Sequence, residues 1–126
     1  MPSLSLTAPI KKLVIVGVGL IGGSFALSLK KAGLVQQVVG VGRSLNNLHT
    51  AQQLGVIDNI SQNLAETAQD ADFILLATPV GQLPHLLQQL NGHLSKNCIV
   101  TDAGSTKGDV VRYAQRYFSA HLSQFV

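Results

Sequence analysis

Acidic residues are scarce in this sequence and are absent from its first part. The 126 residues include six aspartates and glutamates against nine lysines and arginines, which gives a formal net charge of +3. No Asp or Glu occurs from Met1 to Ile57. The basic residues are spread along the chain, and no basic stripe with interleaved aromatic residues accompanies them, so we expect no nucleic acid as a partner.

Cysteine and long apolar runs are lacking as well. Cys98 is the single cysteine, so no second thiol can pair with it, and a reducing cytoplasm is the expected location. The four histidines and this cysteine have no metal-ligand spacing, so we expect no metal site. No stretch approaches the roughly 20 apolar residues of a membrane span, and the first ten residues do not resemble a secretion signal. We therefore expect no membrane association.

The remaining composition is that of a globular protein, with 46% hydrophobic and 12% charged residues. This length suits one domain with a real core and is too short for two ordinary domains. We expect a flexible N-terminal arm over residues 1–10 and a single domain over residues 11–126.

Strand-like and helix-like stretches alternate through this domain, which predicts an α/β fold with a doubly wound parallel sheet between two layers of helices. The expected strands lie near residues 12–16, 38–41, 56–60, 73–77 and 99–101. The expected helices are residues 20–32, ended by Gly33; residues 45–54, capped by Ser44 and followed by Gly55; a helix from Pro79 to Asn91-Gly92; and a last helix around residues 110–118.

A glycine motif between the first strand and the first helix carries the strongest signal. A β-branched apolar run stands directly before a Gly-x-Gly-x-x-Gly turn, and an apolar helical pattern follows it. Gly17 permits the sharp turn, Gly19 leaves no Cβ where a pyrophosphate approaches, and Gly22 lets the helix pack closely on the strand. The start of that helix would direct free N–H groups at the phosphates. The motif predicts a Rossmann-type dinucleotide site with cofactor contacts at Gly17, Gly19, Leu20, Ile21 and Gly22.

The end of the second strand predicts which cofactor is bound. Ligands of open α/β sheets lie beyond the carboxyl ends of the strands. A domain that binds NAD usually has Asp or Glu about 20 residues after the glycine motif, whereas an arginine there accommodates the 2′-phosphate of NADP. Arg43 lies 21 residues after Gly22, Ser44 adds a hydroxyl beside it, and no carboxylate is available. We predict NADP in preference to NAD.

Two further strand ends carry polar residues. Thr78-Pro79 is placed to line the nicotinamide side of the cleft, although a strand end that leads into a helix explains the pair equally well. After the last strand, Asp102 suits either a turn or a chemical role, and Ser105 suits a helix cap. Lys107 falls in the first turn of a helix, where a cation opposes the helix dipole and indicates an anionic partner. Asp102 and Lys107 are candidates for the substrate side.

Four motifs occur in order along the chain: Val16-Gly-Val-Gly-Leu-Ile-Gly-Gly-Ser24, Ala51-x-x-Leu-Gly-Val-Ile-Asp58, Ala77-Thr-Pro-Val80 and Asp102-Ala-Gly-Ser-Thr-Lys107. Together they resemble the nucleotide-binding half of the prephenate/arogenate dehydrogenases, which make the precursor of tyrosine. The resemblance implies oxidative decarboxylation of prephenate or arogenate, with hydride transfer to the nicotinamide as CO₂ leaves and the ring becomes aromatic. It implies that Ser105 approaches the substrate hydroxyl as a catalytic residue. Arg43 departs from the acidic residue or NAD-type pattern that the family usually shows at the end of the second strand, and is consistent with its NADP-using members.

One departure from the family concerns its catalytic histidine, which stands in a Gly-His-Pro motif shortly after a Phe-Val strand. This sequence stops at Phe125-Val126, and proline follows none of its histidines, which are His49, His85, His93 and His121. The helical second domain, which in the family supplies dimer contacts and a substrate-binding arginine, is missing too. The resemblance therefore implies a domain or fragment of a longer, homodimeric enzyme.

Two other hypotheses fit the same fold. The chain could be the cofactor domain of another reductase, such as a hydroxyacid dehydrogenase or a pyrroline-carboxylate reductase, which would have a different set of residues after the last strand. It could also be a sensing module without catalysis, as in channel-gating domains. Thr78-Pro79 and the pair Ser105 and Lys107 argue against a sensor, because a sensor needs no reactive groups at the nicotinamide end.

We predict that this chain alone does not turn over prephenate or arogenate. A positioned general base typically contributes about 10²–10⁴-fold to such a rate, and the candidate histidine lies beyond Val126. NADPH formation should be followed with each substrate, for this chain and for a longer chain that includes the downstream domain. Comparable rates from the two chains would contradict the prediction.

Overall fold

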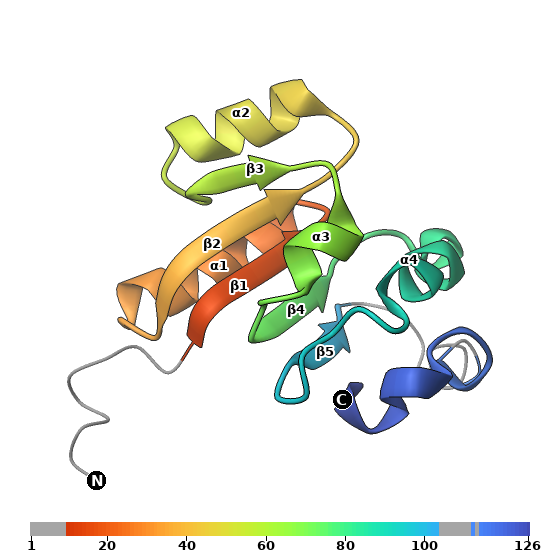
Figure 1. Ribbon diagram of the computed structural model, residues 1–126. Coiled ribbons are helices and arrows are strands. Elements are labelled where there is room, and N and C mark those ends of the chain that lie inside the picture. The colour runs from red at the N-terminus through yellow and green to blue at the C-terminus, as the bar shows by residue number, and fades with distance from the viewer. Residues whose placement is uncertain (1–9, 104–111, 113) are drawn as a thin grey trace, which may run out of the picture.

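The computed structural model describes residues 10–103, 112 and 114–126, and its strands form one five-stranded parallel sheet in the order β3-β2-β1-β4-β5 (Figure 1). The strands are β1 (Ile10–Val16), β2 (Val35–Val41), β3 (Asn59–Ser61), β4 (Phe73–Leu76) and β5 (Ile99–Asp102). The helices are α1 (Leu20–Lys31), α2 (Leu45–Gln53), α3 (Leu64–Ala68) and α4 (Leu83–Leu90), with 3₁₀ turns η2 (Val80–Gln82) and η3 (Ser119–Gln124). Residues 112 and 114–117 are also helical.

Alternation within β1 explains why helices cover both faces of the sheet. Leu13 and Ile15 are fully buried on the face that packs against α1 and α2. Val14 and Val16 point to the other face, where α3, α4 and Phe118 complete a second core. A strand that is buried on both faces needs a continuous apolar run, and β1 has one from residue 13 to residue 16. The predicted doubly wound α/β architecture is confirmed.

Several predicted helix ends are also confirmed. Gly33, Gly55 and Gly92 follow α1, α2 and α4 with φ values of +71°, +79° and +85°, a conformation in which glycine commonly ends a helix. Ser44 caps α2, because its Oγ accepts a hydrogen bond from the N–H of Asn47 at 3.2 Å.

The predicted helix from Pro79 begins later than expected. Residues 80–82 form the 3₁₀ turn η2, and α4 starts at Leu83. Pro84 occupies the first turn of α4, where the missing N–H of proline has no helical partner to lose.

The third strand also differs from the prediction, since it covers Asn59–Ser61 instead of residues 56–60. Ile57 is buried in the core beside α1 and α2 and precedes the ladder, whose first paired residue in β3 is Asn59. Asp58 then joins the chain to β2, because its N–H donates to Val38 O and its carboxylate accepts from Val38 N–H, both at 2.8 Å. The ladder between β3 and β2 begins at the next residue, Asn59.

The short helix α3 was not predicted. With five residues it is too short to show a helical period, but Asn63 caps it by accepting a hydrogen bond from the N–H of Glu66 at 3.0 Å. An Asn followed three residues later by Glu is a sequence signature of a helix start.

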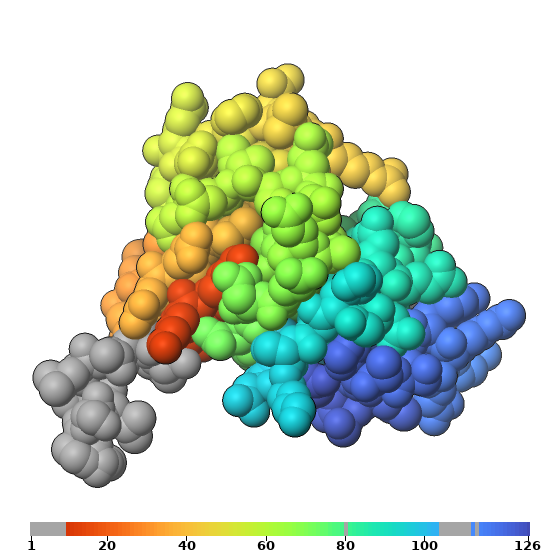
Figure 2. All heavy atoms as spheres, in the orientation of Figure 1, coloured from red at the N-terminus to blue at the C-terminus, as the bar shows by residue number. Residues whose placement is uncertain are grey.

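The last residues of the chain return to the edge strand β5 and pack beside the segment that joins α4 to β5 (Figure 2). Phe118 is fully buried there, and the N–H of Val126 donates to Val100 O at 2.8 Å. The side-chain amide of Gln124 donates to the carbonyls of Ser95 and Cys98, both at 2.8 Å. These contacts cover the outer side of β5 and complete the second core.

The adjacent glycines of α1 provide a matched test of how closely this helix packs on β1. A Cβ at Gly22 would lie 2.8 Å from Gly17 O and 2.8 Å from Ile15 Cγ2, whereas a Cβ at Gly23 would meet only Val56 Cγ1, at 3.5 Å. Overpacking typically costs about 1–3 kcal/mol, and replacing a helical glycine by alanine gains up to about 1 kcal/mol. We predict that Gly22→Ala lowers the free energy of unfolding in urea and that Gly23→Ala leaves it unchanged or raises it. Equal effects of the two substitutions would contradict this packing.

Candidate functional site

The register of the sheet brings the carboxyl ends of its strands to one edge. Val16 at the end of β1 pairs with Val41 at the end of β2 and with Leu76 at the end of β4. On the outer sides, Ser61 of β3 pairs with Val41, and Asp102 of β5 pairs with Leu76. The loops that follow these strands therefore meet at the same edge, on either side of β1 where the strand order reverses.

A cleft of about 430 Å³ opens at this edge. The loops after β1, β2 and β4 form its walls together with one side of α4. Most of the predicted cofactor residues line it, namely Gly17, Gly19, Arg43, Ser44, Thr78 and Pro79. Gly22 is buried beneath it, whereas Leu20 and Ile21 lie on the exposed first turn of α1, with 87% and 59% of their surfaces accessible.

The glycine turn leaves the start of α1 open. Gly17 has φ +88°, and a Cβ there would lie 2.7 Å from Thr78 Cγ2 and 3.0 Å from Ala77 O, so only glycine fits. Gly19 is the N-cap of α1, no side chain caps the helix, and a Cβ at Gly19 would meet nothing within 4 Å. The first N–H groups of α1 thus have an open approach beside them, as an anion-binding helix start requires.

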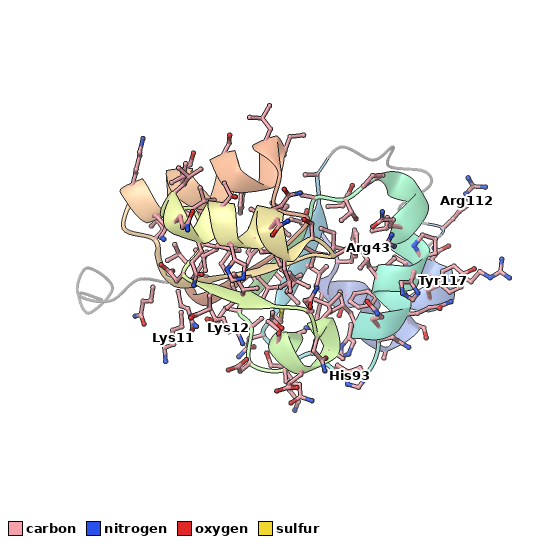
Figure 3. The ribbon with its side chains drawn as sticks, turned by 90° about the horizontal axis from the view of Figure 1, so that it is seen from above. Lys11, Lys12, Arg43, His93, Arg112 and Tyr117 are labelled. Carbon is pink, nitrogen blue, oxygen red and sulfur yellow. The ribbon has the colours of Figure 1, made fainter. Side chains whose placement is uncertain are left out.

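Arg43 and Ser44 stand on the other side of the cleft, between β2 and α2. Figure 3 shows Arg43 between α2 and α4, and its side chain makes no ion pair with any residue that the structure describes. The residues found lining the cleft include no Asp or Glu. Ser44 Oγ accepts the N–H of Asn47 and keeps its own proton to donate. This part of the cleft offers a guanidinium, a hydroxyl and a helix start to an anion.

Thr78 contributes a buried hydroxyl at the end of β4. Its Oγ1 is inaccessible to solvent and has no hydrogen-bond partner within the described part of the chain. An unpaired buried hydroxyl costs free energy, and binding or catalytic positions are a common reason for one. Thr78 thus brings a buried, unpaired hydrogen-bonding group to the cleft.

The predicted substrate-side residues are only partly described. Asp102 is half-buried at the end of β5 and is not among the residues that line the cleft. Ser105 and Lys107 lie outside the described residues, and so does most of the predicted N-terminal arm. Over the described ranges, no three His, Cys, Asp or Glu side chains gather as a metal site would require, and no helix there is long and apolar enough to cross a membrane.

Five polar residues that line the cleft were not predicted from the sequence, namely Asn47, Gln62, Gln82, His85 and Gln89. Gln62 directly follows β3, and His85 lies on the side of α4 that faces the cleft. Gln62 follows the same rule as the predicted residues, since it comes immediately after a strand, but the predicted third strand ended one residue earlier, at residue 60. His85 could be inferred only from the position of α4 across the cleft.

Comparison with known proteins identifies the family. Residues 25–126 match the model described as "Prephenate dehydrogenase, nucleotide-binding domain". The chain belongs to the prephenate dehydrogenase family. It is 40% identical over 118 residues to a prephenate dehydrogenase of Lactococcus lactis and 35% identical over 115 residues to one of Bacillus subtilis.

Solved structures of the prephenate dehydrogenase family share the fold. A prephenate dehydrogenase from A. aeolicus in complex with hydroxyphenyl propionate and NAD⁺ superposes with a TM-score of 0.81 and 32% identity over 91% of this chain. An arogenate dehydrogenase from Synechocystis gives a TM-score of 0.75 and 34% identity over 86% of it. The chain covers 40% and 38% of these two proteins and 32% of the Lactococcus lactis enzyme. It is thus the nucleotide-binding domain of this family, and the predicted resemblance is confirmed.

The unpaired hydroxyl of Thr78 leads to a prediction with an internal control. Thr78→Val replaces an unsatisfied hydroxyl by a methyl group, so we expect the free energy of unfolding to rise by about 1 kcal/mol while dinucleotide binding weakens. Thr67→Val is the control, because Thr67 Oγ1 donates to Ser61 Oγ at 2.6 Å and its loss should lower stability. Urea unfolding and titration with the dinucleotide measure both effects. Loss of stability in Thr78→Val would show that its hydroxyl is paired in the free protein.

Proposed function

We propose that this chain is the NADP-binding domain of a dehydrogenase that oxidatively decarboxylates prephenate or arogenate in the synthesis of tyrosine. The family and the nucleotide-binding role of the domain support the reaction class. The observation that carries the choice of NADP is Arg43 at the end of β2, in a cleft whose described lining holds no carboxylate.

The described residues fit a dinucleotide along the whole cleft. The start of α1 behind Gly17 and Gly19 suits a pyrophosphate, and Arg43 with Ser44 suits a 2′-phosphate. Thr78 follows β4, on the other side of β1 from Arg43, and lines the part of the cleft that suits the nicotinamide half. The nicotinamide, when bound, accepts the hydride; this chain supplies binding and orientation.

The choice of NADP rests on the residues of this chain and is not transferred from a relative. The A. aeolicus enzyme was solved with NAD⁺. A 2′-hydroxyl is usually held by a carboxylate at the end of the second strand, and this chain has Arg43 and Ser44 there instead. A bidentate guanidinium is well suited to a phosphate monoester.

The remaining parts of the proposal concern the whole enzyme. Ser105 would approach the substrate hydroxyl, with Asp102 and Lys107 nearby on the substrate side, and a homodimer would form through residues that this chain does not contain. Relatives named for prephenate and for arogenate are similarly close to this chain, so the proposal includes both substrates. The location of the enzyme in the cytoplasm stays a prediction.

We predict that this chain binds NADP⁺ more tightly than NAD⁺ and that Arg43→Ala removes most of the difference. A charge-assisted hydrogen bond contributes about 1.5–3 kcal/mol, or roughly ten- to hundredfold in affinity, and the rest of the cleft meets groups common to both cofactors. Titration calorimetry with each dinucleotide measures the four dissociation constants.

Arg116 provides the matched control for this experiment. It is an exposed arginine outside the cleft, with its guanidinium carbon 5.4 Å from the ring centre of Tyr117. Arg116→Ala should leave both affinities unchanged. Equal affinities of the wild-type chain for the two cofactors, or a preference for NAD⁺, would overturn the proposed cofactor.

A further inference from the structure

Gln62 connects the edge strand β3 to the loop that carries Arg43. Ser61 ends β3 in register with Val41, so the next residue of each strand lies at the mouth of the cleft. From there the side-chain amide Nε2 of Gln62 donates to the carbonyl of Arg43 at 3.2 Å and reaches that of Gly42 at 3.5 Å. A side chain from β3 thus holds the backbone of the β2–α2 loop.

The backbone on both sides of Gln62 is itself fixed. Ser61 Oγ accepts the N–H of Asn63 at 3.1 Å and the hydroxyl of Thr67 at 2.6 Å, and it donates to Asn63 O at 3.3 Å. Asn63 in turn caps α3. Thr67 is buried, so this hydrogen-bond network is anchored to the core and fixes the backbone from which the side chain of Gln62 extends.

The loop that Gln62 holds has little other support. Gly42 rests on Leu48, whose Cδ2 would lie 3.6 Å from a Cβ at that glycine, and Ser44 caps α2. Arg43 between them is exposed, so its direction depends on the backbone that carries it. The carbonyl oxygens of Gly42 and Arg43 carry partial negative charge, and a phosphate would be repelled if they turned into the cleft. The hydrogen bonds from Gln62 to these two carbonyl oxygens hold them in their present direction.

We propose that Gln62 is a positioning residue for cofactor selection, which holds the Gly42 and Arg43 carbonyls so that the guanidinium of Arg43 and the start of α2 face the 2′-phosphate of NADP. The inference rests on the proposed NADP function. Gln62 acts through Arg43 and the β2–α2 loop, so removal of its amide weakens the binding of NADP, which carries the 2′-phosphate, and not the binding of NAD.

The substitution Gln62→Met tests this role, since it keeps the length of the side chain and removes the amide donor. A lost hydrogen bond of ordinary strength predicts roughly three- to tenfold weaker binding of NADP⁺ and an NAD⁺ affinity within about twofold of wild type. Gln69→Met is the matched control, because Gln69 is exposed at the end of α3 and does not line the cleft. It should change neither affinity.

A double-mutant cycle with Arg43→Ala separates positioning from direct contact. If Gln62 acts through Arg43, then adding Gln62→Met to Arg43→Ala causes no further loss of NADP⁺ affinity. A further loss of the same size, an equal loss for NAD⁺, or an unchanged ratio of the two affinities in Gln62→Met would overturn the inference while the NADP function stands. A wild-type preference for NAD⁺ would overturn both.

Discussion

The register of β1 between its two neighbours is the constraint on which the site depends. Val16 is paired on both sides, with Val41 and with Leu76, and this fixes where three loops leave the sheet. A slip of one residue would move a strand end by about 3.3 Å and turn the apolar residues of β1 to the opposite faces. Both faces are filled by helices, so the register that packs the core also assembles the cleft.

The few acidic residues explain why the Arg43 side of the cleft stays cationic. Asp72 accepts the N–H groups of Lys11 and Lys12 at 2.8 and 3.1 Å, at the opposite end of β1, and Figure 3 shows both lysines far from Arg43. Asp58 is tied to β2 and to Lys30; burial alone would raise the pKa of its carboxyl, but hydrogen bonds from Lys30 and Val38 outweigh burial and lower the pKa. Asp72 binds near the start of β1 and Asp58 binds to the middle of β2, so neither carboxylate brings a negative charge to the end of β2.

Most of the fold and about a third of the residues that line the cleft followed from local signals in the sequence. The glycine turn, the position of Arg43 and the cap at Ser44 each depend on residues that are close in the chain, and a strand-turn-helix pattern reveals them. Gln62 was not predicted because β3 has only three residues and its start is set by the contacts of Asp58 with Val38, which are 20 residues apart. Thr78 was found as a cleft residue, but its unpaired hydroxyl depends on how β4 packs against Gly17.

An exposed arginine can discriminate between two cofactors only if its surroundings direct it. An ion pair in water contributes about 0.2–1 kcal/mol, whereas well-directed hydrogen bonds between charged partners contribute about 1.5–3 kcal/mol. An undirected arginine contributes less because its long side chain loses conformational freedom when the phosphate binds, and this entropy cost offsets part of the attraction. In this chain the loop is held from two sides, by the cap of Ser44 on α2 and by the amide of Gln62 on β3. In the proposed NADP site, selection of the phosphate therefore depends on the edge strand β3 in addition to the residue that carries the charge.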